Sequence, residues 1–486
     1  MAKKFSILIL VAITIGASVA RSADGFIPLG DNEYEFLYDR LERASARLQD
    51  RIDYQLGPYR FDQLTSVPGF LSKIESVHGE DIALFGSIAE HATGRKGSRP
   101  TGYEAYRGGF AARPMNRLFV YGSFVLDEHR ALDPNYRGKK WRGLAGDVEQ
   151  AFASYQTRNF DLIAGRFGSF WGMRHSLILG PQTRMDGFGY QFRWGRMTIS
   201  YRLAALDPLT PENDSVPQQE NRYWAGHRID LHVCNKLRVG LFETIVWGGV
   251  GRSIEPAYLN PMLFFHAFQL NGNVNDNTFL GFDFDYKPIV GLKLYGQLMI
   301  DDFQIEKKSQ GDQEPNEYGA LVGGYFTDIK PGWDLQWEYR RVTNRTYNQG
   351  YARNRYLYEG QVIGSMQGND YDQSTATVHK WINENLRSSL YLSYARQGEG
   401  NPSDPWSEPW LDVVGQYSEK FPTGVVQKQF GIEAGIKGYL NSYIYFNFTG
   451  GLVHYQNYGH QTGVSRTDPQ IQLTLSAFGS THVSLK

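Results

Sequence analysis

The chain of 486 residues contains a single cysteine, Cys234, which excludes an intramolecular disulfide and a cluster of cysteine metal ligands. Its 11 histidines are not grouped at the spacings typical of metal ligands. The hydrolase motifs G-x-S-x-G and H-E-x-x-H are absent. The formal net charge of -1 gives no reason to expect a nucleic-acid partner. We therefore expect neither enzyme activity, nor a cofactor, nor a metal centre.

Long apolar runs are also missing after the first twenty residues, so no membrane-spanning helix is expected there. Lys3 and Lys4, the apolar run 5–19 and the small residues at 18–20 predict a signal peptide over residues 1–20. A transmembrane anchor is the alternative, but the run is short and polar residues follow it at 21–24. No cysteine follows the cleavage site, which excludes a lipoprotein.

What the chain does have is strict alternation of apolar and polar residues in many short segments. Aromatics make up 14% of residues although the mean hydropathy is -0.45. A period of two places one set of side chains on each face of a strand, and wide aromatic faces opposite charged faces are typical of a barrel in a membrane. The clearest segment alternates Trp333, Leu335, Trp337 and Tyr339 with Asp334, Gln336, Glu338 and Arg340.

The segment before the first strand has helical periodicity instead. Residues 31–77 predict an amphipathic helix that ends at Gly57-Pro58 and a second short helix around Phe70, Leu71 and Ile74. We expect residues 21–79 to form a helical plug at the periplasmic mouth and residues 80–486 to form the barrel. The apolar stripe of the first helix comprises Tyr34, Leu37, Leu41, Ala44, Leu48 and Ile52.

The links between strands alternate in length, which predicts about eighteen antiparallel strands over residues 81–478 with short turns on the periplasmic side. The apolar segment 259–270 would break this order as a strand, so we assign it to a long outer loop, as a helix folded into the lumen. The short links are Pro114-Met115, 157–159, Gly195, Cys234-Asn235, 288–291, 330–332, 383–386 and Leu440-Asn441. The long links lie around 92–103, 128–142, 169–183, 207–221, 248–275, 305–317, 347–371, 398–426 and 455–468.

Three carboxylates share the inward face of neighbouring strands: Asp283, Asp285 and Asp301. A metal site or a glycosidase pair is one interpretation. Ordinary ion pairing in the lumen is the simpler one, with Asp285 near Lys293 and Asp283 near Tyr295 if the turn centres on Ile289.

Basic and aromatic residues gather in the outer loops. Aromatic rings stack on sugars, and guanidinium groups bind carboxylate or phosphate, so these loops favour an acidic polysaccharide. Binding of lipopolysaccharide phosphates by the basic residues, with aromatics at the membrane interface, is the alternative. The candidate residues are Arg137, Lys139, Lys140, Trp141, Arg142, Tyr351, Arg353, Arg355, Tyr356, Trp406 and Trp410.

A series of short motifs lies between about residues 165 and 347. The motifs are Gly165-Arg166, Trp171-Gly172, Ser176-Leu177-Ile178-Leu179, Asp186-Gly187, His227-Arg228, Glu243, Tyr258-Leu259-Asn260-Pro261, Asn277, Tyr295-Gly296-Gln297, Asp301-Asp302-Phe303 and Glu338-Tyr339. In order and spacing this series resembles the Wzi-type capsule assembly proteins of the bacterial outer membrane. The resemblance implies an eighteen-stranded barrel, closed from the periplasm by helices, with a lectin-like role in fastening polysaccharide to the cell.

The leading hypothesis is an outer-membrane barrel that binds capsular or extracellular polysaccharide, with outer-membrane lipids, lipopolysaccharide and the barrel-assembly machinery as further partners. A porin for small anionic or sugar solutes is the main alternative, and a hydrolase lacks a nucleophile and base. Two departures from the family pattern stand out. Few motifs follow Asp370, and the chain ends in Ser484-Leu485-Lys486 rather than an aromatic, which makes Phe478 the expected end of the last strand.

Overall fold

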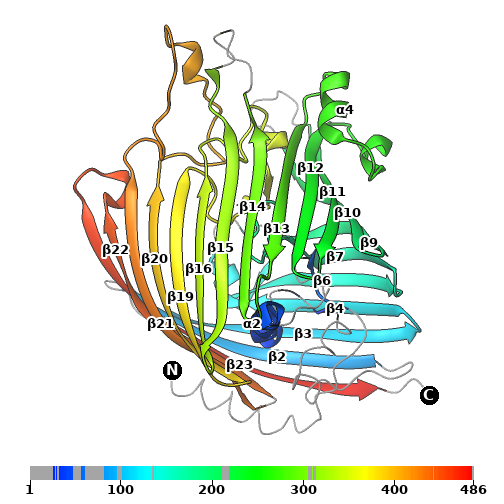
Figure 1. Cartoon of the computed structure of the whole chain (residues 1–486). Coiled ribbons are helices and arrows are strands. Elements are labelled where there is room, and N and C mark those ends of the chain that lie inside the picture. Colours follow the sequence, from blue (N-terminus) through cyan, green and yellow to red (C-terminus); the bar gives the residue numbers. More distant parts are fainter. Residues whose placement is uncertain are drawn as a thin grey trace.

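The fold is a closed antiparallel barrel of eighteen wall strands (Figure 1). The computed structural model describes residues 26–27, 29, 32–47, 56–60, 82–95, 101–133, 136, 138–210, 218–304, 309, 313–441 and 443–483. The wall strands are β2 (Ile82–Arg95), β3 (Thr101–Met115), β4 (Leu118–Asp127), β6 (Leu144–Gln156), β7 (Phe160–Gly168), β9 (Arg184–Trp194), β10 (Met197–Leu209), β11 (Glu220–Cys234), β12 (Leu237–Val250), β13 (Asn277–Tyr286), β14 (Leu292–Asp302), β15 (Glu317–Lys330), β16 (Trp333–Val342), β19 (Tyr371–Asn383), β20 (Leu386–Gln397), β21 (Gln427–Asn441), β22 (Ile444–Gln456) and β23 (Ser465–Val483).

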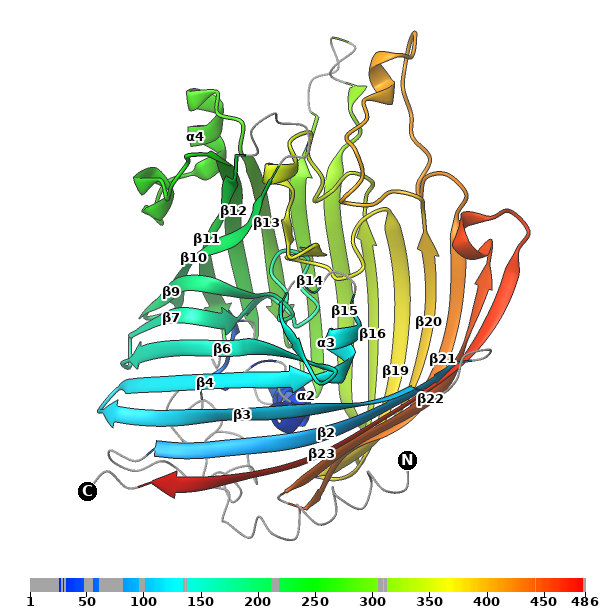
Figure 2. The ribbon, with the colours of Figure 1, turned by 180° about the vertical axis from the view of Figure 1, so that it is seen from behind.

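The first and last wall strands close the barrel by pairing with each other from Ile82 opposite Val483 to Arg95 opposite Gln470 (Figure 2). Closure satisfies the backbone groups that an open sheet edge would leave unpaired. All eight predicted short links fall on the rim where β2 begins, so the strand count and the alternation of link lengths are confirmed. β23 continues beyond Phe478 to Val483, so the expected end of the last strand was wrong.

The alternation along each strand separates a polar interior from an apolar exterior, as the sequence predicts. Ser200 and Arg202 are buried inside the lumen, while Phe282 and Leu241 stand exposed on the outer wall. None of the described helices is long and apolar enough to cross a membrane. The wall strands therefore carry their apolar side chains toward lipid and their charged ones toward the bore.

Helix α2 (Asn32–Arg47) stands inside the bore, where Figure 1 shows it in dark blue near the ends of β14 and β15. Tyr34, Leu37, Leu41 and Ala44 pack as predicted in an apolar cluster with Phe170. On the polar side of α2, Asp39 and Ser45 are buried and Arg43 is half-buried, because they face polar wall residues. The predicted positions Leu48 and Ile52, the second helix and the signal peptide lie outside the described residues.

Ion pairs fix the polar side of α2 to the wall. Asp39 pairs with Arg387 of β20, Lys437 of β21 and Arg174 of the segment 169–183. Burial opposes ionisation of this carboxyl, but the three cations outweigh burial and hold the pKa of Asp39 well below its ordinary value. Arg43 donates to Asp334 over 2.7 Å and to Asp328 over 2.6 Å.

Two long links also fold into the lumen and fill it from the other side. Segment 169–183 contains β8 (Phe170–Trp171), which pairs with β1 (Leu56–Gly57) beyond α2. Segment 343–370 contains η5 (Ala352–Asn354), β17 (Leu357–Tyr358) and β18 (Gln361–Val362). The segments touch where Gly364 meets the Leu177 carbonyl oxygen, which a Cβ at Gly364 would approach to 1.9 Å. Glycine is required there because no side chain fits.

The link 251–276 takes the opposite course. Its turn η3 (Pro256–Leu259) and helix α4 (Phe265–Gly272) pack against the outside of β10, β11 and β12, as both views show (Figures 1 and 2). Assignment of 259–270 to a long loop is confirmed, but its placement in the lumen was wrong. Tyr201 and Ile245, which alternation places on the outer face, are the residues that it covers.

Loss of the charges that hold α2 should open the bore. The double substitution Asp39→Ala and Arg43→Ala leaves Arg174, Arg387 and Lys437 without their carboxylate and frees the helix from β16. We expect single-channel conductance in planar bilayers to rise severalfold. Arg47→Ala, which removes a partly exposed pair with Asp328, should leave it unchanged. Equal, near-zero conductance in all three proteins would mean that segments 169–183 and 343–370 seal the bore without α2.

Candidate functional site

A network of four charged residues lies in the lumen behind segment 169–183. Arg228 bonds Asp283 over 2.6 and 2.7 Å and Asp230 over 2.6 and 2.8 Å, and Arg238 bonds the same two carboxylates. All four side chains are buried, so each charge depends on the others. Gln297 connects this network to the filling segment, because its amide group donates to Asp283 and accepts from the Leu177 amide.

The predicted neighbours of the lumen carboxylates were wrong by two residues. Asp283 lies opposite Gln297 and Asp285 opposite Tyr295, because the hairpin centres on Val290 rather than Ile289. Lys293 instead donates to Ser45 of α2 over 3.0 Å. Asp301 accepts from the Tyr347 amide over 2.8 Å. Within the described part of the chain, no group of three or more His, Cys, Asp or Glu side chains could hold a metal ion.

The first set of predicted loop residues is open to solvent. Lys139, Lys140, Trp141 and Arg142 are all exposed, and β5 (Lys140–Trp141) pairs briefly with the start of β6. The Arg142 guanidinium lies 5.1 Å from the centre of the Trp141 ring. This stretch presents positive charge beside an exposed aromatic side chain. Arg137 lies outside the described residues.

The second set divides between the surface and the lumen. Tyr351 is exposed and carries the Arg353 guanidinium 4.3 Å from its ring centre, while Arg353 also pairs with Glu220. Tyr356 is fully buried. Its hydroxyl accepts from the Trp224 indole and donates to the Ile178 carbonyl, both over 2.8 Å. Tyr356 therefore holds segment 343–370 against β11 and segment 169–183 inside the bore. The prediction that it is an exposed loop residue was wrong.

The third set belongs to a brace between loops. Trp410 is only 2% exposed, and the Arg345 guanidinium lies 5.0 Å from its ring centre. Arg345 also makes a two-pronged ion pair with Glu419 at 2.8 and 3.0 Å. Trp406 remains half-buried at the edge of Trp410. Trp410 lies within η6 (Pro409–Leu411) and is thus a structural residue rather than an open stacking surface.

Hydrogen bonds join the second and third sets into one body. The Arg355 guanidinium donates to the Ser403 and Asp404 carbonyls over 2.8 and 2.7 Å. The Asn348 amide also donates to the Asp404 carbonyl. The loops around 351 and 406, far apart in sequence, therefore move as one unit above the filled lumen.

A cavity of about 420 Å³ lies beside this brace, between the ends of loops 303–316 and 398–426. The sequence did not predict it, because neither stretch has a motif and the walls come from two distant loops. Burial, followed by the charge of Asp302, raises the pKa of the Glu314 carboxyl to about 7. Amides, carboxylates and a phenol of this kind hydrogen-bond sugar hydroxyls. The lining residues are Gln313, Glu314, Pro315, Asn316, Gln416, Tyr417, Ser418 and Glu419.

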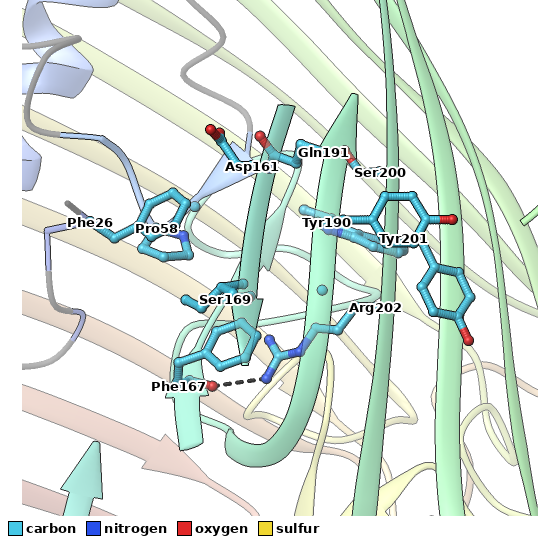
Figure 3. A pocket seen from close by; sticks show the side chains of 14 residues that line it. Phe26, Pro58, Asp161, Phe167, Ser169, Tyr190, Gln191, Ser200, Tyr201 and Arg202 are labelled. Carbon is cyan, nitrogen blue, oxygen red and sulfur yellow. Dashed lines mark hydrogen bonds between the residues drawn. The ribbon is translucent and has the colours of Figure 1, made fainter. Parts of the chain in front are cut away.

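The junction of plug and wall, by contrast, has no room for a sugar. The void there has a volume of about 40 Å³, which suits water molecules. Figure 3 shows the side chains that line it, among them Phe26, Pro58, Asp161 and Arg202. Arg202 donates there to the Phe167 carbonyl over 2.8 Å.

The comparisons with known proteins agree with this architecture. A sequence profile described as "Capsule assembly protein Wzi" matches residues 123–467, which is well over half of the chain. The chain belongs to the Wzi family of capsule assembly proteins. The match continues past Asp370, where the sequence showed few motifs. The closed barrel and its family place the protein in the bacterial outer membrane.

A solved structure of the family shows the same fold. Wzi of Escherichia coli, described as an outer-membrane protein involved in group 1 capsule assembly and a carbohydrate-binding β-barrel, is 18% identical, with a TM-score of 0.60 over 93% of this chain and 99% of that chain. OprD of Pseudomonas aeruginosa is more distant, at 9% identity and a TM-score of 0.47 over 82% of this chain and 95% of that chain. A search of curated proteins found no match.

Removal of one carboxylate from the network should lower the free energy of unfolding of the barrel. Asp283→Ala removes a buried carboxylate that both Arg228 and Arg238 bond, and breaking a buried ion pair by removing one partner costs about 3–5 kcal/mol. Urea unfolding in lipid, followed by tryptophan fluorescence, should show a loss of this size. Asp186→Ala, which breaks a largely exposed pair with Arg166, should cost at most about 1 kcal/mol. Equal losses would contradict the structural role of the network.

The cavity loops should respond to pH through Glu314. The folded pKa of about 7 lies above the ordinary value of 4.5, so Glu314 is neutral below pH 7 and its ionisation disfavours the buried position above it. Hydrogen exchange of residues 313–316 and 416–419, corrected for intrinsic rates, should therefore become faster as pH rises from 6 to 8. Glu314→Gln should remove this change. The same pH dependence in the variant would assign it to another group.

Proposed function

We propose that this protein is a non-enzymatic outer-membrane barrel that binds surface polysaccharide through its outer loops and helps to attach or assemble capsule or exopolysaccharide. The filled lumen supports this proposal most strongly. Leu177, Ile178 and Leu179 are fully buried in the bore, which leaves the rim as the accessible polar surface. The Escherichia coli relative described as carbohydrate-binding shares the fold.

A porin function is less compatible with this arrangement. Passive flux requires a continuous wet path, and α2, segment 169–183 and segment 343–370 all occupy the bore. The charged groups inside bind one another, as Arg228 and Asp283 do, rather than a passing ion. A polar network of this kind rigidifies the filling.

Two chemistries are available at the rim. Lys139, Lys140 and Arg142 offer charge to an acidic glycan or to lipopolysaccharide phosphates, and Trp141 offers an apolar ring face. The cavity beside Tyr417 offers hydrogen-bonding groups that suit neutral sugar hydroxyls. Lipopolysaccharide and the barrel-assembly machinery are proposed as further partners, since the protein must be inserted and held in a lipopolysaccharide-bearing leaflet.

The salt dependence of glycan binding should distinguish charge attraction from aromatic stacking. Substitution of Arg137, Lys139, Lys140 and Arg142 by Gln should weaken retention of cell-derived polysaccharide and flatten its salt dependence, because surface attraction is screened within about 8 Å at physiological ionic strength. Trp141→Ala and Trp406→Ala should weaken binding with the salt slope unchanged, since stacking acts at contact range.

The charge control lies on the opposite rim. Lys236→Gln with Lys330→Gln removes exposed charge beside the short turns and should leave binding intact. The variant with Gln at 137, 139, 140 and 142 is also tested for binding of purified lipopolysaccharide. If it no longer binds lipopolysaccharide but still binds polysaccharide, residues 137–142 form a lipopolysaccharide site. If neither the basic substitutions nor the tryptophan substitutions weaken glycan binding, the lectin hypothesis fails for these loops and the porin hypothesis is favoured.

A further inference from the structure

The link 251–276, here called the outer lobe, is built as a compact unit against the lipid-facing side of the wall. Its two ends are tied by Arg252, which pairs with Asp276 at one end and Glu255 at the other. Tyr258 reinforces this tie, because its hydroxyl donates to Asp276 over 2.6 Å. The Tyr201 hydroxyl of β10 donates to the Tyr258 carbonyl over 2.8 Å. The lobe therefore has a fixed position on the wall.

The outward direction of this position follows from strand alternation. Arg238, Gly240 and Phe242 of β12 face the lumen network, so Glu243 and Ile245 face away from it. The lobe covers this outward side with Tyr258 and Phe265, which are fully buried against it.

A carboxylate and a histidine on the outer wall lie beneath the lobe. The Glu243 carboxylate lies 3.2 Å from His227 Nε2 and accepts from the Phe265 and His266 amides over 2.8 and 2.7 Å. Those amides open helix α4, whose first turn favours a negative charge. Glu243 lies six residues from Leu237 and seven from Val250 along β12, near mid-height of the wall. Directly across the strand pair is Leu280, which is exposed and apolar.

The surface that the lobe turns outward is uncharged. No Lys, Arg, Asp or Glu occurs from residue 256 to residue 275. Met262 is 72% exposed and Leu270 66% exposed, and Phe264 is exposed between them. By contrast, the outer-loop stretch 137–142 contains four basic residues. Exposure of this apolar surface to water would cost free energy. In lipid, the same surface would continue the apolar exterior of the wall.

We infer that the outer lobe is embedded in the outer leaflet and that its apolar surface contacts lipid acyl chains. Irregular backbone is tolerated at membrane depth where its polar groups bond within the protein, and the lobe meets this condition through Glu243, Asp276 and its own helix. The lobe in turn shields Glu243 from hydrocarbon, so that a carboxylate on the lipid face is compensated. The lobe is thus an anchor in the lipid rather than part of the glycan-facing rim.

Spin labels on the lobe test this position without any glycan. In a Cys234→Ser background, single cysteines replace Met262 or Leu270 and are labelled with a nitroxide in phosphatidylcholine liposomes. Leu241→Cys on the bare outer wall supplies the lipid standard, and Val414→Cys at an exposed loop tip supplies the water standard. Power saturation compares collisions with oxygen, which concentrates in hydrocarbon, against collisions with a water-soluble nickel chelate.

Labels at 262 and 270 should match the Leu241 standard, with oxygen collisions well above nickel collisions. A match to the Val414 standard would place the lobe in water and overturn the inference. A third outcome is low access to both reagents, together with broadening of the nitroxide spectrum that disappears when unlabelled protein is mixed in. It would show that a second copy of the chain covers this surface, and it would also overturn the inference. All barrels are checked for folding by resistance to unfolding in detergent at room temperature.

Discussion

A barrel of eighteen strands encloses a bore wide enough for water, and the rest of this structure depends on how that bore is filled. The inner wall carries charged side chains, as expected of a surface that lines a wide bore. Any segment that fills the bore must therefore supply partners for those charges. Asp39 of α2 does so against three cations, and Gln297 does so between the Asp283 network and the Leu177 backbone. The result is a lumen packed by paired charges around an apolar centre.

This filling decides where ligands can be recognised. Tyr356 and Trp224 close the centre of the bore, so a ligand outside the cell meets the polar groups of the loops above it. The brace of Arg345, Glu419 and Trp410 then holds two of those loops as one body beside a cavity. The outer rim is therefore rigid, and the proposed polysaccharide binding is placed there rather than in a channel.

The candidate residues show the limit of sequence reasoning about loops. Trp141 and Trp410 look alike in the sequence, each an aromatic near charge in a long link, yet one is exposed and the other buried. The same holds for Tyr351 and Tyr356, five positions apart. Whether a loop folds into the bore, along the rim or down the outer wall depends on partners that are distant in the chain.

The sequence by itself determined the wall: the strand number, the side of the short turns and the inward or outward direction of each residue. These follow from a period of two and from link length, which are local properties. Only the tertiary structure decided the hairpin register at Asp283, the inward course of residues 343–370 and the outward course of 251–276. Those outcomes depend on which buried charge or backbone group finds a partner across the barrel, and such pairings have no local signature.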